Sequence, residues 1–107
     1  MNKRTTGAAY ERIAGAFLEK QGYQIIACNF RCRLGEIDLI AKDGRYLVFV
    51  EVKYRKNDET GNPLEAVNRR KQQIISRVAN YYCLTHGYGE NTPCRFDVVA
   101  IWGERIK

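Results

Sequence analysis

Three charged residues stand in or directly beside two apolar segments near the middle of the sequence. Asp38 interrupts the segment 37–41, and Glu51 and Lys53 lie at the end of the segment 46–52. A charge in a largely apolar strand costs free energy unless a partner or a metal ion compensates it. Carboxylates are ligands that Mg²⁺ prefers, and a nearby lysine can orient or help to deprotonate an attacking water. The pattern therefore indicates a divalent-metal site suited to phosphate chemistry.

The two segments are separated by Asp43-Gly44, a dipeptide that predicts a tight β-hairpin with positive φ at both central positions. With these two residues as the loop, Glu36 faces Glu51, and Asp38 is the diagonal neighbour of Glu51. Side chains alternate between the faces of a strand, so both carboxylates and the lysine share one face. Diagonal neighbours lie about 7–8 Å apart at the backbone, which leaves the carboxylates within convergent reach.

The rest of the chain predicts two helices and two further strands around this hairpin. Apolar spacing predicts a helix over 7–21, and an Asn-Pro-Leu-Glu start at Asn62 predicts a second helix to about Thr85. Strands are predicted over 23–30 and 95–102. The order αβββαβ predicts an α/β fold with a mixed central sheet flanked by helices. The apolar stripe of the first helix comprises Tyr10, Ile13, Ala14, Phe17 and Leu18.

The composition predicts a single basic domain over residues 1–107. The chain has 18 Lys and Arg against 12 Asp and Glu, a net charge of +6 and a pI near 9.3. This excess favours a polyanionic partner such as nucleic acid, although a basic domain without such a partner also fits the charge. With 45% hydrophobic and 28% charged residues, the composition is that of a globular protein.

The sequence carries no sign of membrane insertion or export. No apolar stretch approaches the ~18 residues of a membrane-spanning helix, and no apolar region follows the basic start. We therefore expect a cytoplasmic protein that does not associate with membranes. Its four cysteines are then expected to be reduced and buried, because their spacing does not match a zinc site; they are Cys28, Cys32, Cys83 and Cys94.

The residues around the predicted metal site resemble the signature of the PD-(D/E)XK nucleases, an acid followed after a variable gap by acid-X-Lys. The matching residues are Ile37-Asp38 and then Glu51-Val52-Lys53, with isoleucine in place of the proline of the signature. The predicted order αβββαβ is also that of the minimal core of this superfamily. The resemblance implies a restriction-endonuclease-like core with a metal-dependent nuclease site.

Longer segments are similar to the small bacterial YraN-like family, which is related to archaeal Holliday-junction resolvases. The similarity extends over nearly the whole chain and is carried by residues 29–31, 35–41, 49–55 and 95–99. It implies an endonuclease that hydrolyses DNA phosphodiester bonds, with branched DNA as a substrate. Because resolvases cut paired strands symmetrically and are usually dimers, it also implies a homodimer.

The resemblance assigns a role to each charged residue of the site. Asp38 and Glu51 would bind Mg²⁺ or Mn²⁺ with the Val52 carbonyl as an additional ligand, and Lys53 would position or activate water. A glutamate of the first helix often joins the metal site in this superfamily, which makes Glu11 the candidate. Spacing alone fits equally well a solvated first-turn glutamate favoured by the helix dipole.

Basic residues near the predicted site are candidates for contacts with the DNA backbone, although each also fits an ordinary solvated charge. Lys71 falls on the apolar stripe of the second helix, so its side chain either extends to solvent or points toward the carboxylates. Asp97 is interpreted as a structural residue that pairs with Arg95 or with a neighbouring loop, in preference to a metal ligand. The candidate nucleic-acid-binding residues are Arg31, Arg33, Arg55, Lys56, Arg70 and Lys71.

Two other functions fit the same residues. A non-catalytic nucleic-acid-binding or recombination accessory module would keep the fold and bind DNA without cutting it. In a purely structural alternative, Glu51 and Lys53 pair with other charges of the sheet. Cleavage and binding assays on Asp38→Ala and Lys53→Ala variants separate the three functions.

Overall fold

The computed structural model describes residues 3–55 and 69–102 of the chain. It confirms the predicted α/β class and the order αβββαβ. The predicted helix start at Asn62 lies outside the described residues. Neither described helix is both long and apolar enough to cross a membrane. The elements are α1 (Lys3–Lys20), β1 (Gln24–Cys32), β2 (Gly35–Asp43), β3 (Tyr46–Arg55), α2 (Arg69–Thr85) and β4 (Cys94–Trp102).

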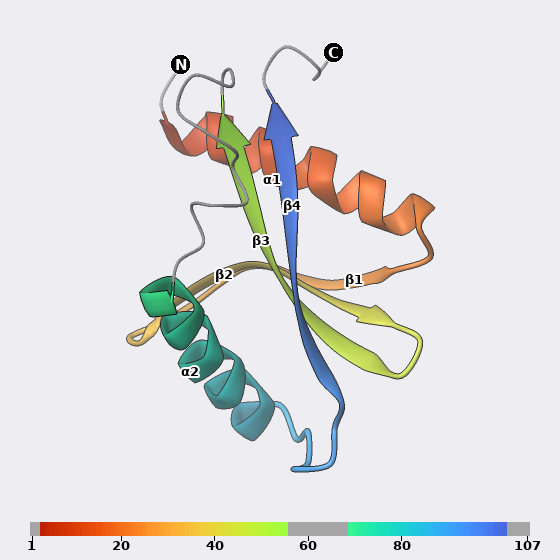
Figure 1. Ribbon diagram of the computed structural model, residues 1–107, viewed down its shortest axis with the longest axis vertical. Coiled ribbons are helices and arrows are strands. Elements are labelled where there is room, and N and C mark those ends of the chain that lie inside the picture. Colours follow the sequence, from red (N-terminus) through yellow and green to blue (C-terminus); the bar gives the residue numbers. More distant parts are fainter. Residues whose placement is uncertain (1–2, 56–68, 103–107) are drawn as a thin grey trace.

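The strands form one sheet in the order β1-β2-β3-β4 (Figure 1). The pairs β1–β2 and β2–β3 are antiparallel, whereas β3 and β4 are parallel. A parallel pair needs a crossover connection, and α2 lies in the segment that joins β3 to β4. The predicted mixed sheet is therefore confirmed.

The two helices pack on opposite faces of the sheet, because alternate residues of β3 point to opposite sides. Val48 and Val50 are buried against α1, and Leu47 and Phe49 are buried against α2. Burial of one such side chain stabilises the fold by about 1.5–3 kcal/mol. Apolar layers therefore fix β3 from both faces, and this strand carries Glu51, Val52 and Lys53 of the predicted metal site.

The sheet-facing side of α1 is narrower than the sequence predicts. Ala14 and Gly15 are buried, whereas Ile13 and Phe17 are 39% and 52% exposed. The prediction that Ile13 and Phe17 belong to the core is therefore wrong. Gly15 faces β1, where a Cβ would make an ordinary contact of 4.0 Å with Cγ1 of Ile25. The helix thus buries Ala14, Gly15 and Leu18 against the sheet and leaves Ile13 and Phe17 partly in solvent.

The β2–β3 hairpin turns at Gly44-Arg45, so the predicted Asp43-Gly44 loop is wrong. Asp43 pairs with Tyr46, which shifts the predicted pairing by two residues. Gly44 has a φ of +60° and Arg45 has no positive φ, as in a type II′ turn, which needs a positive φ only at its first central position. Because side chains repeat with a period of two, this shift changes the cross-strand partners and preserves the faces.

Candidate functional site

The strands β2 and β3 separate at the residues that carry the predicted carboxylates. Their last pair is Leu39 with Val50, and the next residues are Asp38 and Glu51. Beyond this point the backbone N–H of Val52 donates a hydrogen bond of 2.7 Å to Oδ2 of Asp38. A side-chain carboxyl thus replaces a strand carbonyl as acceptor, and it lies within hydrogen-bonding reach of Glu51.

Glu51 is a buried carboxylate held between two lysines. It is only 3% exposed, and its Oε2 lies 2.9 Å from Nζ of Lys71 and 3.3 Å from Nζ of Lys53. Removing a carboxylate from water costs several kcal/mol unless charges and hydrogen bonds compensate it. The structure confirms the alternative in which Lys71 points toward the carboxylates, and this ion pair ties α2 to β3. We call Asp38, Glu51, Lys53 and Lys71 the carboxylate–lysine cluster.

The pKa values of the two carboxyl groups in this cluster are shifted in opposite directions. Burial, together with the hydrogen bond and charge of Glu51, raises the pKa of Asp38 from 3.8 to about 7, although the N–H of Val52 opposes the shift. Burial would raise the pKa of Glu51, but hydrogen bonds from Lys71 and Asp38 and the lysine charges lower it overall. Adjacent carboxylates cannot both ionise freely, so Glu51 keeps the charge and Asp38 holds the proton near neutrality.

Glu11 lies near this cluster but is hydrogen-bonded elsewhere. Burial raises its pKa, a hydrogen bond from Asn29 partly opposes this, and the charges of Glu36 and Glu51 raise it further. Within residues 3–55 and 69–102, no three His, Cys, Asp or Glu side chains gather as a cage for a metal ion. The contribution of Glu11 to a metal site therefore stays a prediction.

The contact between Asn29 and Glu11 was not predicted. Asn29 has a φ of +54°, a left-handed conformation in which asparagine is enriched among non-glycine residues. The preference of asparagine for this conformation is the one local sequence signal that could have pointed to Asn29 within β1. The contact itself depends on how α1 packs against β1, which local sequence does not encode.

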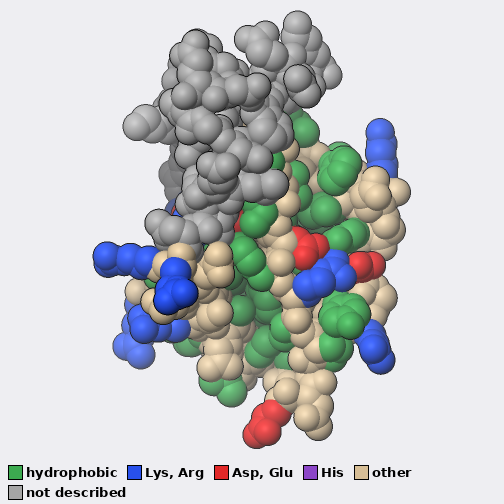
Figure 2. Space-filling model, in the orientation of Figure 1, with side chains coloured by type: hydrophobic (Ala, Val, Ile, Leu, Met, Phe, Trp, Pro, Cys, Tyr) green, Lys and Arg blue, Asp and Glu red, His purple; other side chains and the backbone are tan. Residues whose placement is uncertain are grey.

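The predicted basic residues occupy different surroundings. Arg31 forms an exposed ion pair with Glu36 at 3.0 Å and is its partner on β1. The predicted pairing of Glu36 with Glu51 is wrong, because the β2–β3 pairing ends at Leu39 and Val50 in a register two residues away from the predicted one. Arg33 is exposed in the β1–β2 turn, and Arg70 is exposed on α2. Lys and Arg side chains gather on the side of the molecule where α2 lies (Figure 2). Lys56 and the side chain of Arg55 lie outside the described part of the chain.

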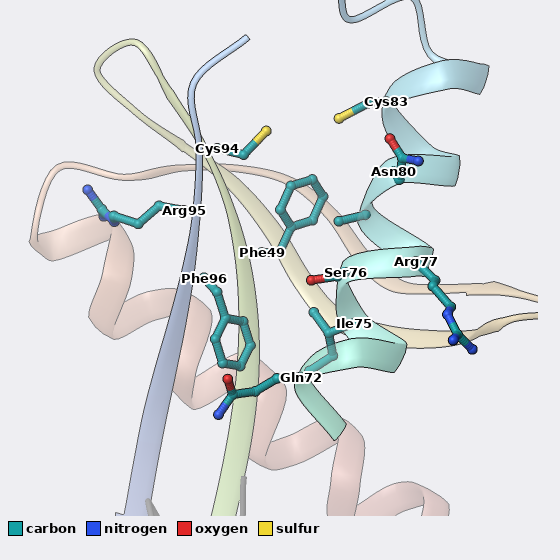
Figure 3. Close-up of a pocket in the computed structure, with 11 residues that line it drawn as sticks. Phe49, Gln72, Ile75, Ser76, Arg77, Asn80, Cys83, Cys94, Arg95 and Phe96 are labelled. Atoms are coloured by element: carbon teal, nitrogen blue, oxygen red, sulfur yellow. The ribbon is translucent and has the colours of Figure 1, made fainter. Parts of the chain in front are cut away.

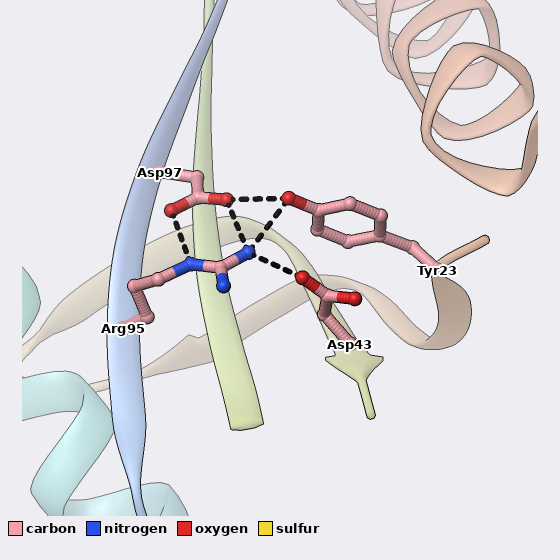
Figure 4. A network of polar contacts seen from close by, with 4 residues as sticks. All are labelled: Tyr23, Asp43, Arg95 and Asp97. Carbon is pink, nitrogen blue, oxygen red and sulfur yellow. Dashed lines mark hydrogen bonds and ion pairs between the residues drawn. The ribbon is translucent and has the colours of Figure 1, made fainter. Parts of the chain in front are cut away.

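A second ionic cluster confirms the structural interpretation of Asp97. Arg95 donates from Nε and Nη2 to the two carboxylate oxygens of Asp97, both at 3.0 Å (Figure 4). Nη2 also donates to Asp43 at 2.9 Å and to the hydroxyl of Tyr23 at 2.7 Å. Burial would raise the pKa of Asp97, but Arg95 and Tyr23 lower it overall. We call these four residues the Arg95 cluster.

Comparisons with known proteins match a region of the chain that contains the carboxylate–lysine cluster. The model of the family described as Uncharacterised protein family UPF0102 matches residues 10–101. A UPF0102 protein of Lachnoclostridium phytofermentans is 53% identical over 107 residues, covering 100% of this chain and 91% of that protein. A UPF0102 protein of Symbiobacterium thermophilum is 52% identical over 98 residues, covering 92% and 82%. One of Hahella chejuensis is 47% identical over 94 residues, covering 88% and 75%.

Proposed function

Given that this chain belongs to the UPF0102 family, we propose that its carboxylate–lysine cluster is the active site of a metal-dependent endonuclease that hydrolyses DNA phosphodiester bonds. One observation carries the proposal: buried Glu51 lies against a second carboxyl group and two lysines where β2 and β3 separate. The resemblance to PD-(D/E)XK nucleases supports it, because the same residues match the signature of that superfamily.

The donor set of this cluster fits a divalent cation. Asp38 and Glu51 offer adjacent hard oxygen ligands of the kind that Mg²⁺ and Mn²⁺ take. Burial raises the pKa of Asp38 and the charge of Glu51 raises it further, because the two groups repel each other when both are charged. A cation would relieve that repulsion. The Val52 carbonyl and Glu11 are proposed as further ligands on the resemblance. When bound, the cation would neutralise charge that develops on the phosphate.

The lysines have separate roles in the proposed reaction. Lys53, with a side chain 21% exposed, would orient the attacking water through its ammonium group. Lys71, with a side chain 40% exposed, would contact a non-bridging phosphate oxygen. The water oxygen bonds to phosphorus and gives up a proton to solvent, the P–O bond to the leaving oxygen breaks, and that oxygen takes up a proton from solvent. Removing either ammonium should therefore slow cleavage more than it weakens DNA binding.

The proposed substrate is branched DNA, and the proposed active form is a homodimer. Both follow from the similarity to the resolvase-related family. A symmetric dimer carries two active sites related by a two-fold axis, which suits paired cuts in a four-way junction. Arg31, Arg33, Arg55, Lys56 and Arg70 would hold the backbone on either side of the cut. Light scattering after size-exclusion chromatography, with and without a junction, measures the assembly.

A cleavage assay tests the proposal directly. The purified chain is incubated with linear, flapped and four-way DNA in Mg²⁺, Mn²⁺ or EDTA, beside Asp38→Ala and Lys53→Ala. Glu36→Ala serves as the matched control, because Glu36 is an exposed acid on the same strand as Asp38. We expect cleavage that needs the metal, disappears in both site variants and persists in the control.

Two other results would contradict the proposed function. DNA binding that survives in both site variants without any cutting would identify a non-catalytic accessory module. Absence of both cutting and salt-sensitive binding would leave the cluster with a structural role alone.

A further inference from the structure

Two cysteines from separate elements meet in a cavity that the carboxylate–lysine cluster does not line. Cys83 lies in the last turns of α2, and Cys94 is the first residue of β4. Both line a cavity of about 650 Å³ between these elements, and their thiols point toward each other (Figure 3). The two thiols are close enough to interact by a side-chain hydrogen bond.

The other two cysteines provide an internal comparison. Cys28 and Cys32 both lie on β1, four residues apart, which places them about 13 Å from each other along a strand. A disulfide requires Cα atoms no further apart than about 7 Å. The strand therefore keeps Cys28 and Cys32 from bonding to each other, whereas α2 and β4 bring Cys83 and Cys94 together.

The members of the facing pair differ in access to solvent. The expectation that the four cysteines are buried is wrong for all of them, because Cys28 and Cys94 are exposed and Cys32 and Cys83 are half-buried. Sγ of Cys94 lies 3.5 Å from the backbone carbonyl of Thr92. Cys83 is half-buried, and burial together with the proximity of Cys94 raises the pKa of its thiol to about 11. An oxidant from solvent therefore meets Cys94 first, while Cys83 stays protonated behind it.

We propose that Cys83 and Cys94 form a modification site that reacts with a hydroperoxide and closes as an intramolecular disulfide. The inference uses only the meeting of these two thiols across the cavity. It is independent of the proposed nuclease function and needs no DNA for its test.

The reaction takes place in two balanced steps. The Cys94 thiolate attacks one oxygen of hydrogen peroxide, an S–O bond forms as the O–O bond breaks, and the departing hydroxide takes a proton to become water. Cys83 then gives up its thiol proton as its sulfur attacks the sulfur of this sulfenic acid, an S–S bond forms, the S–O bond breaks, and the departing hydroxide takes that proton to become a second water. Two thiols lose two electrons and the peroxide gains them.

Closure would link the end of α2 to the start of β4 across ten intervening residues. A cross-link that closes a loop of this length restricts the unfolded chain and is expected to raise Tm by about 5–15 °C. Because Lys71 lies on the same helix, the link would also hold α2 against the sheet that carries Glu51.

The test uses the full reduced chain treated with hydrogen peroxide under native conditions. Remaining thiols are alkylated, and disulfides are mapped by mass spectrometry of unreduced peptides. We expect an intramolecular Cys83–Cys94 link in wild type and in the C28S/C32S double variant, with a higher Tm for the oxidised protein. In Cys83→Ser, Cys94 should stop at the sulfenic acid and be labelled by dimedone.

Three results would overturn the proposal. The first is the recovery of both Cys83 and Cys94 as alkylated thiols after oxidation of the wild-type chain. The second is a link that forms only between chains. The third is equally rapid oxidation of Cys83 in Cys94→Ser, where we expect at least a roughly tenfold slower loss of this thiol. Mapping on the unsubstituted chain decides the first two even if a variant fails to fold.

Discussion

Two ionic clusters lie on opposite faces of one sheet, and they compensate their carboxyl groups in different ways. The carboxylate–lysine cluster lies on the face covered by α2, as its contact with Lys71 requires. The Arg95 cluster lies on the other face, because Arg95 neighbours Val48, which packs toward α1. Both clusters contain two carboxyl groups, so the difference between them comes from how those groups are arranged.

The Arg95 cluster separates its acids with a guanidinium, whereas the carboxylate–lysine cluster sets them side by side. The pKa of Asp97 falls under the influence of Arg95, and the pKa of Asp38 rises to about 7 because burial and Glu51 disfavour its charge. A strongly raised carboxyl pKa marks a group kept for chemistry or for a cation more often than one kept for stability. The difference supports a structural role for the Arg95 cluster and a functional role for the other.

The largest expected effect is on cleavage when the charge of Glu51 is removed. Glu51→Gln keeps the shape of the side chain but deletes the carboxylate that both lysines contact, so we expect cleavage to fall by about 10²–10³-fold. Single-turnover cleavage of a four-way junction measures the change. Glu36→Gln, which alters an exposed acid of β2, should stay within about twofold of wild type; equal losses in both variants would contradict the assignment.

The next largest effect is a dependence of stability on pH that is caused by the titration of Asp38. Its pKa is about 7 in the folded chain and 3.8 ordinarily, so between these values the folded chain binds more protons than the unfolded chain. The free energy of unfolding should therefore fall as pH rises through this window, by about 1–3 kcal/mol. Asp38→Asn mimics the protonated form and should remove most of that fall.

Urea denaturation at pH 5 and pH 8 measures this linkage. Asp43→Asn is the matched control, because Asp43 belongs to the Arg95 cluster and lies on the same strand as Asp38. Wild type and Asp38→Asn losing equal stability between the two pH values would show that Asp38 titrates normally.

Sequence patterns predict which side of the sheet carries the site residues, but they do not predict the contacts that these residues make. The period of two predicts Asp38 and Glu51 on one side in either hairpin register, and the hydrogen bond between the two carboxyl groups agrees with this. The alternation of β2 is nevertheless interrupted at Asp38, because Ile37 packs toward α2 and Leu39 toward α1. Local sequence does not determine where the turn lies, because Gly44 can be either the first or the second residue of the loop. Which way Lys71 points depends on the packing of α2 over β3, a tertiary property that helical spacing does not contain.

A smaller effect is expected from the Arg95 cluster, and it concerns stability rather than cleavage. Arg95→Gln leaves Asp97, Asp43 and Tyr23 without their shared donor, which should lower the free energy of unfolding by about 1–2 kcal/mol. The expected loss is below that of a buried pair because the Arg95 side chain is 35% exposed and solvent screens its charge. Cleavage at saturating Mg²⁺ should not change.

Arg45→Gln is the matched control for this variant. The guanidinium of Arg45 lies 5.6 Å from the centre of the Tyr46 ring, and that of Arg95 lies 5.5 Å from the same ring. Both arginines thus make a cation–π contact with Tyr46, worth about 0.5–1 kcal/mol at exposed sites. Arg95 differs in its bonds to the carboxylates of the cluster and in a second cation–π contact, 5.6 Å from the centre of the Tyr23 ring. Equal losses of stability in Arg45→Gln and Arg95→Gln would mean that the carboxylates add nothing.

The smallest effect is expected from the exposed pair of Arg31 and Glu36, which calibrates the other two clusters. Their side chains are 57% and 49% exposed, so solvent screens the 3.0 Å contact. A double-mutant cycle with Arg31→Ala and Glu36→Ala should give a coupling of about 0–0.5 kcal/mol. The same cycle on Lys71 and Glu51, whose side chain is 4% exposed, should give a larger coupling, because the carboxylate that Lys71 meets is removed from water. Equal couplings would show that burial does not set the carboxylate–lysine cluster apart from an ordinary surface pair.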